Sequence, residues 1–240
     1  MQQQDNPDEA GTQGQSNAGI DFAAMPGMAI KVITNPVGFY QQMSKSGGFV
    51  EPLVFMVVLA LVAGLLQAVL PLLGLSLAGA MAMGFVAIIL VPIFTVIFGF
   101  IGAAIAFIIW KIMGSQENFE TAFRCMAFTA AVAPVTAVLG AIPYVGTAAG
   151  ALWPMALLAI ASVHVHQRSA GASWGVFGII GLLFAFISLS METAGRKMTG
   201  EMEGWQQQMD EKYGNPEDMA PEEAGKAMGE FLKGLKQESE

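Results

Sequence analysis

The stretch that decides the fold lies between Pro52 and Trp110 and reads PLVFMVVLALVAGLLQAVLPLLGLSLAGAMAMGFVAIILVPIFTVIFGFIGAAIAFIIW, without one charged residue. A transmembrane helix needs about 20 mostly apolar residues, because the hydrocarbon core of a bilayer is about 30 Å thick and each residue rises about 1.5 Å. The stretch is therefore long enough for two spans. Proline and glycine break it at Pro71-Leu72-Leu73-Gly74, so we expect spans near residues 53–73 and 85–109.

Further apolar stretches follow this one toward the C-terminus. Residues 125–163 are long enough for two spans, separated by Pro143-Tyr144-Val145-Gly146-Thr147, and residues 169–191 for one. We place these spans near residues 122–142, 146–165 and 172–191. The sequence therefore predicts an all-α, polytopic membrane helix bundle with five transmembrane helices over residues 51–191, accompanied by amphipathic interfacial and C-terminal helices.

Charged residues are rare in this apolar region and gather at the two ends of the chain. The sequence is 54% hydrophobic and 12% charged, whereas soluble domains average about 25% charged residues. The net charge of −8 lies in the tails, since residues 192–240 carry twelve acidic side chains against six basic ones. Phosphate binding needs clustered Lys and Arg, so the sequence argues against nucleic acid as a partner. The charged residues between Pro52 and Met191 are Lys111, Glu117, Glu120, Arg124 and Arg168.

The basic residues near the spans indicate the orientation. With five spans, five of these residues lie on the side of the N-terminus and two lie near the opposite face. Basic residues near span ends are retained on the cytoplasmic side. We therefore predict a cytoplasmic N-terminus and a C-terminus on the opposite face. The first group is Lys31, Lys45, Lys111, Arg124 and Arg168, and the second is Arg196 and Lys197.

The residues before the first span divide into a tail and an interfacial segment. Residues 1–27 are rich in polar and acidic side chains without Lys or Arg, which predicts a disordered polar tail. Residues 28–50 interleave apolar and polar side chains. We expect them to form an amphipathic segment at the membrane interface, with Lys31 and Lys45 toward anionic headgroups.

Residues 192–240 are predicted to form an acidic, amphipathic helical tail. Met and Trp recur there at a helical spacing, which places them on one stripe. A second amphipathic stretch begins near Pro221, a residue favoured at the start of a helix. Methionine adapts to irregular surfaces, so the stripe can dock a partner protein or a second copy. The alternative is a helix that rests on the membrane or on its own bundle. The first stripe is Met198, Met202, Trp205 and Met209, in line with Met191, and the second is Ala224, Met228, Phe231 and Leu235.

The sequence contains no motif typical of catalysis. It lacks His-Glu-x-x-His, Gly-x-Ser-x-Gly, a phosphate loop and a cysteine pair. Its two histidines are His164 and His166, close to Arg168. On a strand they would share a face and could hold a metal ion, but at a helix end they point about 200° apart, which favours an interfacial polar cluster. We therefore predict a non-enzymatic protein without a cofactor or a metal site.

The predicted spans offer little chemistry for transport. Ionisable groups inside a bilayer are costly and usually functional, and the span interiors contain none. Pro92, Pro134 and Pro154 can break helices to form a site near the midplane, or can simply kink them. A small channel or transporter subunit is the alternative to a protein that organises the membrane or partner proteins.

Five short motifs precede or enter the predicted spans. They are Asn35-Pro36-Val37-Gly38-Phe39-Tyr40, Glu51-Pro52-Leu53, Phe123-Arg124 leading to Pro134, Ile142-Pro143-Tyr144-Val145-Gly146, and the span that ends at His164. With the five spans, they resemble the YIP domain family, the Ypt/Rab-GTPase-interacting membrane proteins, and its bacterial members most closely. The resemblance covers about residues 30–192.

This resemblance implies a non-enzymatic, partner-binding, multi-pass protein of a bacterial inner membrane. Eukaryotic members engage prenylated GTPases through the N-terminal region, but an Asp-Leu-Tyr-Gly-Pro motif associated with that region is absent here. The resemblance therefore does not extend to GTPase binding. Expected partners are the lipid bilayer and either a protein or a second copy of the chain, bound through the bundle or the tail. The family-motif positions are Pro36, Pro52, Arg124, Pro134, Pro143 and Gly146.

Overall fold

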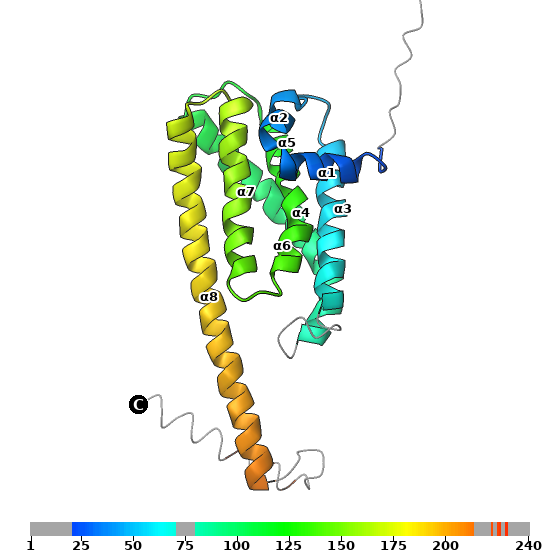
Figure 1. Cartoon of the computed structure of the whole chain (residues 1–240), viewed down its shortest axis with the longest axis vertical. Coiled ribbons are helices and arrows are strands. Elements are labelled where there is room, and N and C mark those ends of the chain that lie inside the picture. The colour runs from blue at the N-terminus through cyan, green and yellow to red at the C-terminus, as the bar shows by residue number, and fades with distance from the viewer. Residues whose placement is uncertain (1–20, 71–79, 214–221, 223–224, 227–228, 230–240) are drawn as a thin grey trace, which may run out of the picture.

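A computed structural model describes residues 21–70 and 80–213, together with positions 222, 225–226 and 229. These residues form helices and connections, without a strand. The chain is an all-α membrane helix bundle (Figure 1), as the sequence predicts. Five helical segments are long and apolar enough to cross a membrane, and they are Val50–Val69, Ile88–Ile112, Phe119–Leu139, Val145–His164 and Ala170–Gly204.

The long uncharged stretch forms the helices α3 (Val50–Val69) and α4 (Ala80–Ile112), which pack against each other. α4 continues through Pro92. Its outward side is apolar, suited to contact with lipid, and a helix satisfies its backbone hydrogen bonds internally in such surroundings. The exposed residues of this side include Ile93, Ile97, Ile101, Ile105 and Ile108.

The third candidate span consists of three consecutive helical pieces. They are α5 (Phe119–Phe128), the 3-10 helix η2 (Thr129–Val132) and α6 (Ala133–Leu139). Asn118 begins α5, because its side chain accepts a hydrogen bond from the Thr121 amide at 2.9 Å. Pro134 lies in the first turn of α6. Its ring disfavours an α-helical residue before it and it lacks an N–H, which explains the change of helical winding at this point.

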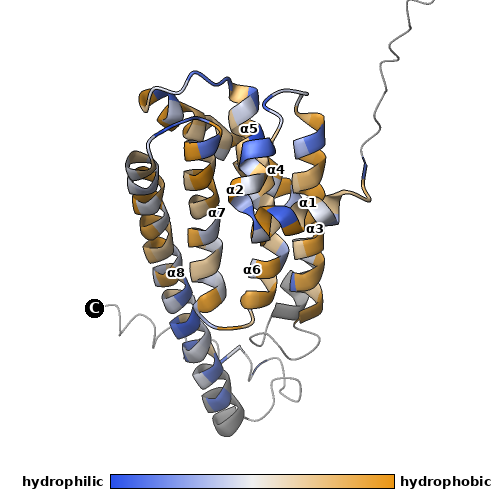
Figure 2. Cartoon of the chain, turned by 45° about the horizontal axis from the view of Figure 1, so that its top comes forward, coloured by the Kyte–Doolittle hydropathy of each residue, from blue (hydrophilic) through white to orange (hydrophobic). Residues whose placement is uncertain are grey.

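The last two helices, α7 (Val145–His164) and α8 (Ala170–Tyr213), lie side by side. The sequence suggests a span ending at residue 191 and a separate tail, but α8 is one continuous helix of 44 residues. No proline interrupts it, and Glu192 pairs with Arg196 one turn later instead of ending the helix. Figures 1 and 2 show that α8 extends beyond the bundle and becomes more hydrophilic there.

The segment before the first span forms the helices α1 (Met25–Thr34) and α2 (Pro36–Gln42). α1 begins inside the stretch that the sequence assigns to the polar tail. Asn35 separates the two helices and caps α2, since its side chain accepts from the Gly38 amide at 3.0 Å. Val32 and Tyr40 are buried, so the apolar face of this segment packs on the chain's own helices.

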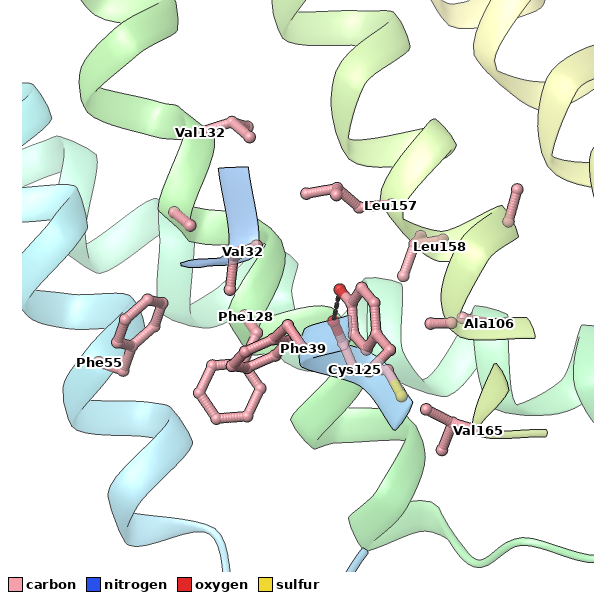
Figure 3. Close-up of a cluster of buried hydrophobic side chains, with 14 of the residues drawn as sticks. Val32, Phe39, Phe55, Ala106, Cys125, Phe128, Val132, Leu157, Leu158 and Val165 are labelled. Atoms are coloured by element: carbon pink, nitrogen blue, oxygen red, sulfur yellow. Dashed lines mark hydrogen bonds between the residues drawn. The ribbon is translucent and has the colours of Figure 1, made fainter. Parts of the chain in front are cut away.

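An aromatic cluster joins α2 to the core (Figure 3). The ring of Phe128 lies 4.9 Å from that of Phe39 and 5.2 Å from that of Phe55, between centroids. The Tyr40 hydroxyl donates a hydrogen bond to the Cys125 carbonyl oxygen at 3.2 Å. Burial raises the pKa of Tyr40 well above its usual value, with a smaller contribution from Cys125, so the phenol stays protonated and remains a donor. These contacts make the N-terminal helices part of the fold.

Candidate functional site

Three connections meet at one end of the bundle, which we call the polar end. They are residues 43–49 between α2 and α3, residues 113–118 between α4 and α5, and residues 165–169 between α7 and α8 (Figure 1, top). Their polar groups bond to one another across 51 to 120 residues of sequence. The polar end is therefore built by the tertiary fold and not by local structure.

Arg124 is central to the polar end, and its side chain is only 3% exposed. Its Nε atom donates to Ser44 O at 2.8 Å, Nη1 to Gly48 O at 3.1 Å and Nη2 to Glu51 Oε2 at 2.8 Å. The planar guanidinium thus binds the connection before α3 through several donors, which Lys cannot reproduce. Gly47 and Gly48 have positive φ angles of 123° and 83°, a conformation that glycine adopts readily.

Lys45 connects the other two loops of the polar end. Its Nζ atom donates to Glu117 Oε1 at 2.7 Å and to Val165 O at 3.1 Å. The Gly48 amide donates to Glu120 Oε1 at 2.6 Å. Because the Lys45 and Glu117 side chains are 42% and 25% exposed, we expect this ion pair to contribute only about 0.2–1 kcal/mol. Its role is to align the connections.

His166 lies in a buried cluster beneath these connections. Its ring stacks on that of Trp110, with centroids 3.8 Å apart and planes at 17°. The Nδ1 atom shares a 2.8 Å hydrogen bond with Ser115 Oγ, and Nε2 lies 3.9 Å from Cys125 Sγ. The cluster joins the ends of α4 and α7 to α5.

The Cys125–His166 pair does not have the properties of a catalytic pair. Burial, and then the positive charges of Lys45, Arg168 and Lys111, lower the pKa of His166 from 6.5 to about 3. A catalytic imidazole must take up the thiol proton and become positively charged. The surroundings of His166 oppose that charge and keep the ring neutral. Cys125 and His166 are 0% and 2% exposed, so a substrate cannot reach them in this structure. The pair fits a packing role.

The two histidines have different surroundings. His164 Nδ1 lies 3.3 Å from Gln41 Nε2 on the surface, whereas His166 is buried. Among the residues that the structure describes, no three His, Cys, Asp or Glu side chains are grouped as metal ligands would be. Arg168 donates to His166 O at 2.8 Å and to Met113 O at 3.0 Å, and so holds the connection before α8 against the end of α4.

Two family-motif positions lie at the turn between α6 and α7. Pro143 is in the turn, and Gly146 is the second residue of α7. Tyr144 has a left-handed φ of 64° in this turn. Gly146 packs directly on Gly140, and a Cβ atom at position 146 would overlap the Gly140 backbone. Glycine is therefore required here for a close approach of two backbones.

α8 closes the same turn from the side. Glu192 Oε1 accepts from the Tyr144 amide at 3.1 Å and from Arg196 Nη2 at 2.6 Å. The guanidinium of Arg196 lies 5.2 Å from the centre of the Tyr144 ring, within the range of a cation–π contact. This contact marks the level at which α8 leaves the bundle.

The remaining family-motif prolines lie in first turns of helices. Pro36 is the first residue of α2, Pro52 is buried near the start of α3, and Pro134 is the second residue of α6. Proline is tolerated there because the first amides of a helix have no intrahelical acceptor. These positions therefore set where helices begin.

The methionine stripe of α8 lies past the contact with the turn. Met198 and Met202 are 61% and 57% exposed. Trp205 and Met209 follow on the same helix, and their side chains lie outside the described part of the structure. Of the predicted stripe, Met198 and Met202 are therefore exposed side chains of α8.

Sequence reasoning missed most of the polar end. The signal that could have found it is position, because each of these residues lies at the boundary of an apolar stretch on the predicted cytoplasmic side. Partners cannot be assigned from such positions alone. Lys45, Glu51 and Glu117 were named from the sequence but without their partners, and the residues missed altogether are Ser44, Trp110 and Ser115.

Comparison with known proteins identifies the family. The model of the Yip1 domain matches residues 30–191. No curated protein and no solved structure matches the chain. The match includes all five candidate spans up to the middle of α8, together with α2, the polar end and the turn before α7. The chain is an integral membrane protein that belongs to the Yip1 domain family.

Proposed function

We propose that the chain is a non-enzymatic scaffold of a bacterial inner membrane, which organises the membrane or partner proteins. The observation that carries the proposal is the methionine stripe of α8, exposed beyond the bundle at Met198 and Met202. If the last span ends near residue 191, as the sequence predicts, this surface lies outside the bilayer, where an exposed apolar surface is typical of an interaction site. By contrast, the titratable groups of the polar end bind their neighbours, so the stripe is the better candidate for a binding surface.

The charge distribution supports a cytoplasmic polar end and an α8 extension on the opposite face. Basic residues favour the cytoplasmic side of a span, and Arg196 and Lys197 are the two near the other end of the bundle. A cysteine at Ser46 or at Lys197, labelled in intact cells with an impermeant maleimide, tests this orientation. Labelling of the 197 variant alone is expected, and labelling of the 46 variant alone would reverse the assignment. The basic residues that support it are Lys31, Lys45, Lys111, Arg124 and Arg168.

Crosslinking with mass spectrometry in native membranes tests the scaffold. The full chain is compared with a chain truncated after Lys197, which keeps the contact of Glu192 with Arg196. A second comparison replaces Met198 and Met202 with Gln. Its control replaces Lys197 and Glu203 with Gln on other sides of the same helix.

A protein partner that is lost in the truncated and stripe variants, and kept in the control, is the expected result. If the stripe variant and the truncated chain capture the same partner as the full chain, the stripe is not the binding surface and the proposal is wrong. Solute flux through liposomes containing only the purified protein would favour the channel or transporter alternative.

A further inference from the structure

The two halves of the bundle differ in build, and the short helices α1, α2 and α5 lie in the half next to the polar end (Figures 1 and 2). We propose that this half widens the leaflet in which it lies, so that the protein is a wedge that prefers membranes curved with the polar end on the convex side. The partner is the lipid surface, contacted by the outward face of α1. The inference rests on the proposed role in organising the membrane and specifies how the bundle performs it.

Large buried side chains are concentrated in the half next to the polar end. Phe55 near the start of α3, Trp110 near the end of α4 and Phe177 near the start of α8 are each at most 1% exposed. Phe123 and Phe128 of α5 are buried among them. The distance between packed helices depends on the side chains at their contact. Bulky contacts and three additional helices therefore give this half a wide cross-section.

The opposite half is narrow by comparison. In residues 60–69 of α3, 88–102 of α4, 145–156 of α7 and 178–204 of α8, every buried residue is glycine, alanine or proline, for example Ala63, Gly146 and Gly181. Small residues at a contact let helix axes approach closely. The third span shows the same change along its length, because seven of the ten residues of α5 are buried whereas α6 has no buried residue. The cross-section therefore decreases from the polar end toward the other end.

α1 lies within the wide half and across the axis of the bundle (Figure 1). Its Val32 belongs to the same buried cluster as Val132 of η2 and Leu157 of α7 (Figure 3). Leu157 precedes the end of α7 by seven residues, a rise of about 10 Å. With its 20 residues, α7 is about as long as the hydrocarbon core is thick. α1 is therefore placed inside the leaflet, at a depth typical of amphipathic helices that lie in the membrane plane.

The outward face of α1 suits this depth. Ile30 is 61% exposed, and Phe22, just before the helix, is 60% exposed. The Thr34 hydroxyl donates to the Ile30 carbonyl oxygen at 2.7 Å and is thus satisfied within the helix. Lys31 is the single charged residue of α1, and its Nζ atom donates to Gln42 Oε1 at 2.7 Å. Its long stem allows the ammonium group to stay at the level of the headgroups.

The N-terminal helices are fixed to the bundle, so the widening is permanent. The ring of Phe39 lies 4.9 Å from that of Phe128, and the buried Tyr40 donates to the Cys125 carbonyl oxygen. Arg124 holds the connection before α3 through three donors. Amphipathic helices at a membrane surface respond to curvature. Because the added area lies in one leaflet, a bilayer in which that leaflet is expanded accommodates the protein best.

Sorting between vesicles of different size tests the wedge. The full chain carries Gln116→Cys, an exposed position of the polar end, and is labelled there with a fluorophore, since Cys125 is 0% exposed. It is reconstituted at low density into phosphatidylethanolamine and phosphatidylglycerol vesicles of about 50 nm and about 400 nm diameter, sizes chosen to differ strongly in curvature. An impermeant quencher separates copies with the polar end outward from copies with the polar end inward.

The expected result is a preference of opposite sign for the two orientations. Copies with the polar end outward should be at least about twofold denser per membrane area in the small vesicles, and copies with the polar end inward should be depleted there by a similar factor. Equal densities would overturn the proposal, as would a preference that is reversed or is the same for both orientations.

The depth of α1 is tested separately with a nitroxide attached to Ile30→Cys. The controls are Ile105→Cys, which is 55% exposed and lies seven residues before the end of α4, and Gln116→Cys in the connection after α4. Collision rates with oxygen and with a water-soluble nickel chelate are compared in vesicles. The Ile30 site should match the Ile105 site, whereas a match with the Gln116 site would place α1 in water and overturn the proposal.

Both measurements use purified protein without a partner and leave the methionine stripe unchanged. A failure of the wedge therefore leaves partner binding through the stripe intact. Conversely, a stripe that captures no partner leaves the sorting and the depth of α1 as expected here.

Discussion

His166 lies flat against Trp110, with ring centroids 3.8 Å apart and planes at 17°. This stack joins the connection before α8 to the end of α4. Arg168 adds a second link, because it donates to the Met113 carbonyl oxygen 55 residues earlier in the chain. Because the imidazole is buried and faces several positive charges, a proton on His166 would be unfavourable in the folded state. The stack therefore requires a neutral ring.

The stability of the protein should decrease in acid because of His166. Folding lowers the pKa of His166 from 6.5 to about 3, so the unfolded chain binds a proton in this range that the folded chain does not. We expect the full free energy of unfolding above pH 6.5, and a loss of up to about 1.4 kcal/mol per pH unit below it, until about pH 3. Denaturant unfolding in detergent micelles at a series of pH values measures this slope.

The control for this prediction is His166→Phe, which keeps an aromatic ring on Trp110 and removes the titration. Lys45, Lys111 and Arg168 are present in both proteins, so their contributions cancel in the difference. The variant loses the hydrogen bond to Ser115 and is expected to be less stable at neutral pH, with a flatter dependence on pH. Parallel curves for the two proteins would contradict the prediction.

Arg124 should matter much more for stability than its ion-pair partner Glu51. Arg124→Gln leaves the carbonyl oxygens of Ser44 and Gly48 without their donors, and we expect a loss of about 2–4 kcal/mol from these unsatisfied groups. Glu51 is 48% exposed, so Glu51→Gln should cost only about 0–1 kcal/mol. Thermal unfolding of both variants in the same detergent compares them. Equal losses would mean that the ion pair, and not the backbone contacts, carries the effect.

The five helices could be predicted from the sequence because the bilayer requires long apolar stretches and the chain keeps its charges out of them. The details that the sequence did not predict have local or tertiary causes. The 3-10 turn at residues 129–132 arises beside Pro134. α8 continues past residue 191 because the Glu192–Arg196 pair belongs to the helix. The polarity of a residue indicates where a span ends, but it does not determine where a helix ends.

The candidate site was less predictable than the fold. Arg124 could be singled out by its family motif, but its acceptors lie 73 to 80 residues away, and no periodicity connects them. The surroundings of His166 depend on Trp110 and Ser115, which are unremarkable in the sequence. The methionine stripe, by contrast, was visible because helical spacing is a local property.

Gly146 should tolerate no larger side chain, whereas Gly150 on the same helix should. A Cβ atom at position 146 overlaps the Gly140 backbone, and one at position 150 has nothing within 4 Å. Gly146→Ala is therefore expected to destabilise by about 1–3 kcal/mol through overpacking. Gly150→Ala should be neutral or stabilising by up to about 1 kcal/mol, because alanine is the better helix former. Denaturant midpoints measure both, and a neutral Gly146→Ala would show that the turn can move aside.

Glu192 should hold the turn between α6 and α7 against α8. Its Oε1 atom accepts from the Tyr144 amide, at a residue whose left-handed φ of 64° is unfavourable without such support. Glu192→Ala is expected to cost about 1–2 kcal/mol and to speed amide hydrogen exchange at residues 140–146. Glu203→Ala, an exposed acidic position of the same helix, is the control and should change neither. The substitution also removes the partner of Arg196, so the place of the faster exchange decides between two roles. Faster exchange confined to the turn would mean that the Glu192 carboxylate supports Tyr144. Faster exchange only along α8 would mean that the carboxylate stabilises the helix through Arg196 instead.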